Sequence, residues 1–224
     1  MINKMNKMMR DPVLHPVKAL AITGILGGLM LLARVIYTGN LMHSHLVWNL
    51  YLAWMPLFFA YILLKSGDLT QRKVQLYALV FLWLLFFPNA PYIITDFIHL
   101  KNTTGNLLLL DSILVFTFAL TGLGAGLISL HWVYKSLKMH YSTSFSKVVM
   151  LTSVVLSGYG VFLGRSLRWN SWDLFMNPMP LLKDSIMHLN DKVAIAMTLL
   201  FSGLVLTGYF LFINLMRLKD EESV

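Results

Sequence analysis

Long runs of apolar residues, separated by short polar stretches, make up most of the chain. A helix that crosses a membrane needs about 20 consecutive, mostly apolar residues. The runs that meet this requirement cover residues 17–37, 46–64, 74–94, 107–133, 148–167 and 193–216. They are continuous rather than alternating, which excludes a membrane β-barrel. The pattern therefore predicts an all-α protein, a polytopic bundle of six transmembrane helices.

The composition supports a lipid environment. The chain is 57% hydrophobic and only 12% charged, whereas a soluble domain is about half apolar and about one quarter charged. A protein interior of this size cannot bury so many apolar residues. We therefore expect the lipid bilayer as a partner. The connections between the runs are short, which predicts a single membrane domain over residues 1–224.

The basic residues predict how the chain is threaded. Twelve of the 18 lysines and arginines, among them Lys4, Lys7 and Arg10, fall on the side of the spans that carries both termini. The positive-inside rule then predicts a multi-pass protein of the cell membrane with both termini in the cytoplasm. The formal charge of +8 follows from this arrangement, so we expect no nucleic-acid partner. The first run is too long for the core of a signal peptide, and we expect it to be retained.

The third run is interrupted by the segment Pro88-Asn-Ala-Pro91. The residue before a proline is pushed away from helical geometry, so we expect Phe87 and Ala90 to be extended and the third helix to be broken. Freed backbone groups are costly in hydrocarbon unless they are paired, and Asn89 is placed to pair with them. Broken helices line binding sites in transporters. A helix that simply ends at the membrane surface is the alternative.

The residues after this segment include side chains that could act in catalysis or bind a metal. On a helix, Tyr92, Asp96 and His99 share one face, because they are four and seven positions apart. Asp96 and His99 are the candidates for a catalytic pair or for metal ligands, and an interfacial hydrogen bond is the alternative. Cysteine is absent, which excludes thiolate ligands and a cysteine nucleophile. The sequence leaves the identity of any cofactor open.

A second polar stretch, Arg165 to Asp173, follows the fifth run. Arg165 and Arg168 share a helix face, and guanidinium groups suit phosphate and carboxylate. A phosphate-bearing lipid or an anionic solute is therefore the expected partner. Snorkelling to the membrane surface, or a salt bridge to Asp96, Asp111 or Asp173, would account for the same arginines.

Further polar residues map to the same end of the spans. Asn49 and Asp111 lie inside the second and fourth runs, where they need partners, and Asp111 could pair with Arg34, Arg165 or Arg168. His43 and His45 form a weaker candidate metal pair in the first outer loop. We expect an outward-facing polar cluster whose candidate ligand-binding residues are Asn49, Asn89, Tyr92, Asp111, Arg165, Arg168, Asn170 and Asp173.

Three stretches resemble a known family. They are Trp48-Asn-Leu-Tyr-Leu-Ala-Trp54, Phe87-Pro-Asn-Ala-Pro-Tyr-Ile-Ile-Thr-Asp-Phe-Ile-His-Leu100 and Arg168-Trp-Asn-Ser-Trp-Asp173. Together they resemble the bacterial membrane family catalogued as domain of unknown function 1361. The resemblance implies a multi-pass inner-membrane protein, and it implies no activity, substrate or catalytic residue.

Three functions remain open from the residues. The first is binding or translocation of an anionic or amphipathic ligand at the outward-facing cluster. The second is a membrane-embedded enzyme that acts on a lipid-linked substrate. The third is an accessory or assembly protein whose polar residues form a purely structural salt-bridge network. The sequence leaves open whether the protein is an enzyme, and it leaves the oligomeric state open.

Overall fold

The computed structural model describes residues 15–66, 72–103, 105 and 107–221, with the backbone alone over 217–221. The described chain is helical, and six of its helical segments are long and apolar enough to cross a membrane. This confirms the predicted all-α fold and its six spans. The elements are α2 (His15–Thr38), α3 (His45–Lys65), α4 (Lys73–Phe86), α5 (Asn89–Tyr92), the 3-10 helix η2 (Ile93–Asn102), α6 (Leu107–His140), α7 (Thr143–Ser166), α8 (Asp173–Met176), α9 (Pro178–Met187) and α10 (Lys192–Glu221).

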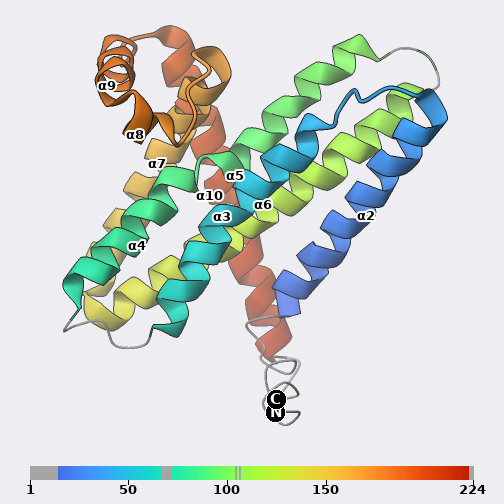
Figure 1. Cartoon of the computed structure of the whole chain (residues 1–224). Helices are drawn as coiled ribbons and strands as arrows, with labels where there is room; N and C mark the ends of the chain where they lie inside the picture. Colours follow the sequence, from blue (N-terminus) through green and yellow to red (C-terminus); the bar gives the residue numbers. More distant parts are fainter. Residues whose placement is uncertain (1–14, 67–71, 104, 106, 222–224) are drawn as a thin grey trace.

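Helix α6 is the centre of the bundle (Figure 1). It contacts α2, α3, α5, η2, α7 and α10, and α7 packs against α10. At the upper end in Figure 1, α2 ends, α3 and α6 begin, and the short helices α8 and α9 join α7 to α10. We call this the distal end, and it is where the functional candidates gather.

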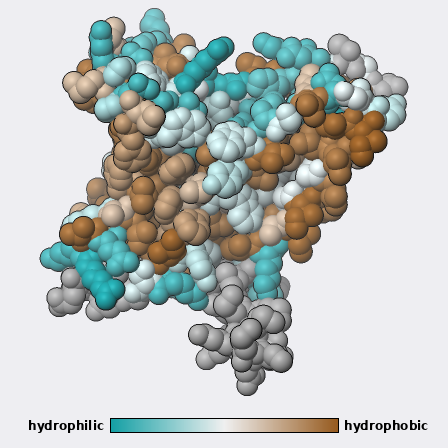
Figure 2. Space-filling view, in the orientation of Figure 1, coloured by the Kyte–Doolittle hydropathy of each residue, from teal (hydrophilic) through white to brown (hydrophobic). Residues whose placement is uncertain are grey.

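The surface between the two ends is apolar. Figure 2 shows brown, hydrophobic side chains across the middle of the visible face and teal, hydrophilic ones towards both ends. On α2, the exposed stripe Ile22, Ile25, Leu29, Leu32 and Ile36 leaves 55% to 75% of each residue uncovered. These positions recur every three to four residues and so share one face. An apolar face of this length is stable when lipid covers it.

The Pro-Asn-Ala-Pro segment is not extended, so that part of the prediction is wrong. Phe87 has φ −57° and ψ −36°, and Ala90 lies within α5. The chain turns at Phe87 and Pro88 and then continues as α5 and η2, so a helix broken by an extended segment is not what the structure shows. The backbone accommodates the prolines by local 3-10 bonding, such as the Ala90 N–H to the Phe87 carbonyl at 3.1 Å.

Asn89 does pair with a freed backbone group, as the sequence predicts. Its side-chain amide donates to the Phe86 carbonyl at 2.9 Å and to Ser171 Oγ at 3.0 Å. Ser171 Oγ in turn donates to the Leu85 carbonyl at 2.9 Å. These bonds satisfy carbonyls near the end of α4 and attach the loop after α7 to it.

Glycines let this segment enter between α6 and α7. A Cβ on Gly126 would lie 2.5 Å from the Cβ of Ala90, and one on Gly160 would lie 2.7 Å from Pro88. A Cβ on Gly122 would lie 2.9 Å from Ile93. Such contacts are shorter than real Cβ atoms allow, so the packing requires glycine at these positions.

The threading across the membrane stays a prediction. Lys4, Lys7 and Arg10 lie outside the described residues, as do the side chains of Arg217 and Lys219.

Candidate functional site

A buried carboxylate lies at the distal end. Asp96, on η2, is only 1% exposed. Side chains from three elements surround it: His45 and Asn49 from the first two turns of α3, His99 from η2 itself, and Arg165 from the last turn of α7. We call these five residues the Asp96 cluster. The sequence predicted Asp96, His99, Asn49 and Arg165 individually, and the structure brings all four together.

The two oxygens of Asp96 have different surroundings. Asn49 Nδ2 donates a hydrogen bond of 2.7 Å to Oδ2. Oδ1 faces Arg165 Nη1 at 3.6 Å, His99 Nε2 at 3.8 Å and His45 Nε2 at 3.9 Å. These three distances exceed those of hydrogen bonds. Arg165 supplies the opposite charge that a buried carboxylate needs. Oδ1 itself accepts no hydrogen bond from the three side chains that face it.

The 3-10 geometry of η2 changes which residues share a face. In a 3-10 helix, side chains three positions apart eclipse each other, so Asp96 and His99 point the same way. Tyr92 is four positions before Asp96, so its side chain does not point the same way as those of Asp96 and His99. Its ring would lie 3.2 Å from a Cβ on Gly164 of α7. The predicted single face of Tyr92, Asp96 and His99 is therefore wrong, because it assumed an α-helix.

A cavity of about 250 Å³ adjoins the cluster. It lies between α3, α4, α5 and α7 and extends to α8 and α9. Three carboxamides, Asn49, Asn89 and Asn170, line it together with the Tyr92 ring. Most of the remaining wall is apolar or aromatic and consists of Trp48, Leu52, Leu84, Leu85, Pro88, Leu163, Trp169, Leu174 and Leu181. We call it the amide pocket; Asn49 is the one residue that belongs to both the pocket and the Asp96 cluster.

The loop after α7 shapes one wall of the pocket. Arg168 has φ 62°, in the left-handed region that few non-glycine residues adopt. Its side chain is exposed and forms no hydrogen bond or ion pair within the described part of the chain. Asp173 accepts from the Asn170 backbone N–H at 2.7 Å, and Trp169 Nε1 donates to Asp184 on α9 at 3.0 Å. Asp173 and Arg168 thus lie beside the pocket and outside its lining.

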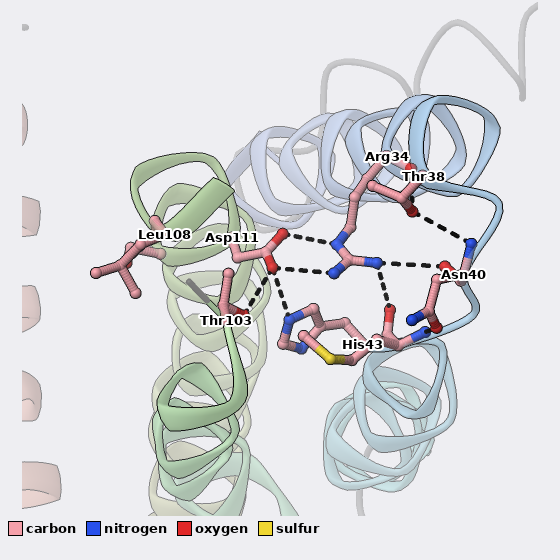
Figure 3. A network of polar contacts seen from close by, with 9 residues as sticks. Arg34, Thr38, Asn40, His43, Thr103, Leu108 and Asp111 are labelled. Carbon is pink, nitrogen blue, oxygen red and sulfur yellow. Dashed lines mark hydrogen bonds and ion pairs between the residues drawn. The ribbon is translucent and has the colours of Figure 1, made fainter. Parts of the chain in front are cut away.

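Asp111 belongs to a separate network (Figure 3). Arg34 Nε donates to Oδ1 at 2.7 Å and Arg34 Nη2 to Oδ2 at 3.1 Å. Thr103 Oγ1 at 2.9 Å and His43 Nε2 at 3.1 Å also contact Oδ2. Arg34 further donates to the backbone carbonyls of Asn40 and Met42. This network ties the α2–α3 connection and the end of η2 to α6. Of the partners that the sequence offered, Asp111 pairs with Arg34.

The two networks lie next to each other. The ring centroids of His43 and His45 are 6.1 Å apart. His43 has φ 71° and is fully buried, and its Nδ1 has no hydrogen-bond partner among the described residues. Strained backbone of this kind occurs where surrounding contacts hold it in place, and here the bond to Asp111 does so.

His45 is the residue of the cluster that the sequence interpretation placed in a loop. The predicted second span began at residue 46, so His45 was assigned to the connection before it. In the structure α3 begins at His45. His45 and Asn49 are four positions apart and therefore share a face of α3. That spacing was a usable signal for a histidine beside Asn49, although it did not show that the face meets Asp96.

Comparison with known proteins identifies a family and nothing closer. A family model described as "Protein of unknown function (DUF1361)" matches residues 48–207. The match includes Asn49, Asp96, His99 and Arg165, and His45 lies just before it. No curated protein and no solved structure matches the chain.

Proposed function

This chain belongs to the DUF1361 family, and we propose that it is an integral membrane protein that binds an amphipathic ligand with an uncharged polar head in the amide pocket. The observation that carries the proposal is that one cavity is lined both by three amide side chains, Asn49, Asn89 and Asn170, and by an apolar wall. Binding sites for small molecules are largely apolar cavities with a few polar groups that fix orientation.

The polar residues of the pocket favour a head with hydroxyl or amide groups. A carboxamide both donates and accepts hydrogen bonds, so it matches groups that do the same. Among the residues that the structure describes, no lysine or arginine lines this cavity. Arg165 already faces Asp96 at 3.6 Å. An anionic head would therefore find its positive partners outside the pocket, which makes the uncharged head the better fit.

The apolar part of the ligand would contact leucine side chains. Leu84 and Leu85 on α4 and Leu163 on α7 line the same cavity. About 250 Å³ is slightly below the usual volume of ligand pockets, and it holds a polar head and a short part of a chain. The rest of an alkyl chain would extend along the apolar surface between the helices.

Binding is a better-supported function than translocation. Below the pocket the core is closed by buried residues that pack against one another, including Trp83, Phe87, Ala125, Ile128 and Leu130. Transport would require a path through this layer.

An enzyme that acts on a lipid-linked substrate is the second candidate function, and the convergence of Asp96, His99 and His45 favours it. A carboxylate that orients a histidine as a base does so through a hydrogen bond. The Asp96–imidazole distances of 3.8 Å and 3.9 Å are too long for that bond, so binding remains the preferred proposal.

Fluorine NMR of the protein labelled with 5-fluorotryptophan tests the binding function. The chain has six tryptophans, of which Trp48 and Trp169 line the pocket and Trp132 lies in the core away from it. The protein in lipid nanodiscs is titrated with octyl glucoside or with octyl phosphate, which have the same alkyl chain and different heads. We expect the Trp48 and Trp169 signals to shift saturably with octyl glucoside, while Trp132 stays unchanged.

A matched pair of variants makes the test specific. Asn170→Ala removes a pocket amide and should weaken octyl glucoside binding by about two- to tenfold, as the loss of one hydrogen bond does. Asn177→Ala removes an amide that contacts the same Asp173 and lies outside the pocket, so it should bind as the wild type does. Equal shifts of all tryptophans without saturation would contradict a pocket. Saturation by octyl phosphate alone would contradict the uncharged head.

A further inference from the structure

Three ligand atoms converge in the Asp96 cluster. One ring nitrogen of His45, one ring nitrogen of His99 and a carboxylate oxygen of Asp96 all lie within 4.8 Å of one another. A tetrahedral zinc ion with bonds of about 2.1 Å would hold such atoms about 3.4 Å apart. The Oδ1–Nε2 distances of 3.8 Å and 3.9 Å exceed this by about half an ångström, so an ion would draw the three side chains closer together.

The Nε2 atom of each of the two histidines can offer a lone pair to an ion. His45 Nε2 is buried and has no hydrogen-bond partner among the described residues. His99 Nε2 faces Arg165 Nη2 at 3.5 Å. Because a guanidinium group only donates, His99 must direct a lone pair towards it. A neutral imidazole with its lone pair directed inward is the form that binds metals.

Asp96 is also held as a ligand would be. The Asn49 amide fixes Oδ2 at 2.7 Å and leaves Oδ1 for the two histidines. Metal ligands are commonly oriented by such outer hydrogen bonds. The side chains of His45 and His99 are 39% and 36% exposed, which gives an ion access from the distal end.

We propose that His45, Asp96 and His99 bind a divalent transition-metal ion of the zinc class, and that Arg165 moves away from Asp96 Oδ1 when the ion enters. Two imidazoles and one carboxylate are the donor set of zinc sites that keep a fourth position open. The ion replaces the positive charge that Arg165 supplies to Asp96 in the absence of metal. The released guanidinium then carries its charge beside the ion, where it can pair with an anionic group bound at the fourth position.

This metal site does not depend on the binding function of the amide pocket. Asn49 is common to both, but the metal is detected without any amphipathic ligand. Failure of one proposal therefore leaves the other to its own test.

Cobalt(II) titration of the purified full chain, stripped with a chelator and freed of any affinity tag, tests the site. We expect a visible absorption band that saturates at one equivalent and is abolished by competing zinc. His99→Ala and Asp96→Asn should weaken binding by more than about 100-fold, since outer-shell changes alone cost about 10- to 100-fold. His188→Ala, which removes a histidine of the same end outside the cluster, should bind as the wild type does.

Arg165→Gln separates a metal site from a structural ion pair. Removing a cation that competes for Asp96 should tighten cobalt binding by about tenfold or more, as nearby charges do for protons. Circular dichroism and gel filtration show whether each variant is folded, and His45→Ala replaces Asp96→Asn if the latter is not. The proposal is overturned if the wild type binds no cobalt, or if folded His45→Ala and His99→Ala bind it as tightly as the wild type.

Discussion

The side-chain amide of Asn49 donates a hydrogen bond of 2.7 Å to Asp96 and also lines the amide pocket. One residue of α3 therefore joins a buried carboxylate on η2 to a cavity that reaches α9. This is possible because α3 contacts both η2 and α4. The metal-binding and ligand-binding proposals meet at this side chain.

Asn49→Leu should destabilise the protein. The change leaves Oδ2 of the buried Asp96 without its hydrogen bond, and an unsatisfied buried polar group costs about 1–3 kcal/mol. The free energy of unfolding can be measured by dodecyl sulfate titration in mixed micelles. Asn214→Leu is the control, because its amide donates an exposed hydrogen bond to the Phe210 carbonyl of its own helix and forms no other within the described part of the chain. Equal losses in the two variants would show that the Asn49–Asp96 bond contributes nothing particular.

The Arg34–Asp111 pair should behave as a buried structural ion pair. The two side chains are 8% and 0% exposed. Arg34→Met leaves the carboxylate buried without its cation, which costs about 3–5 kcal/mol. The double variant Arg34→Met, Asp111→Leu removes both charges and should be more stable than Arg34→Met alone. If Asp111→Leu instead lowers the stability further by a similar amount, the main role of Asp111 is not to pair with Arg34.

Gly126→Ala should destabilise the bundle although alanine favours helices. Its new methyl group would lie 2.5 Å from the Cβ of Ala90, and overpacking of this kind costs about 1–3 kcal/mol. Gly28→Ala is the matched control, because no neighbouring atom of the described residues lies within 4 Å of a Cβ there, and it should be neutral or slightly stabilising. Thermal unfolding of both variants, followed by circular dichroism, gives the comparison. A Gly126→Ala variant as stable as Gly28→Ala would contradict the close approach of α5 to α6.

The apolar runs predicted the spans because hydropathy reports directly on burial in lipid. The predicted range 17–37 became His15–Thr38, and 46–64 became His45–Lys65. The prediction was poorest where helices continue past the apolar region. Helix α6 ends at His140 rather than at residue 133, since its last turns carry lysines that hydropathy does not count as membrane.

The site was only partly predictable for a different reason. Single polar residues inside an apolar run or just after one stand out, so Asp96, Asp111 and Asn49 could be identified one by one. Their pairings depend on which helices are neighbours, and no local pattern shows that α7 places Arg165 against η2 while α2 places Arg34 against Asp111. The 3-10 form of η2 was also invisible to a helical-face argument, which misplaced Tyr92.

We predict that the Asp96 cluster and the amide pocket face the outside of the cell, while both termini lie in the cytoplasm. The chain has no native cysteine, so single cysteines can replace Asn177 at the distal end and Ser144 at the start of α7, both exposed. Intact cells are treated with a membrane-impermeant maleimide, and lysed cells serve as the control for reactivity. We predict labelling of Asn177→Cys and protection of Ser144→Cys. Labelling of Ser144→Cys with protection of Asn177→Cys would place the cluster in the cytoplasm, and labelling of both would contradict a bundle that spans the membrane.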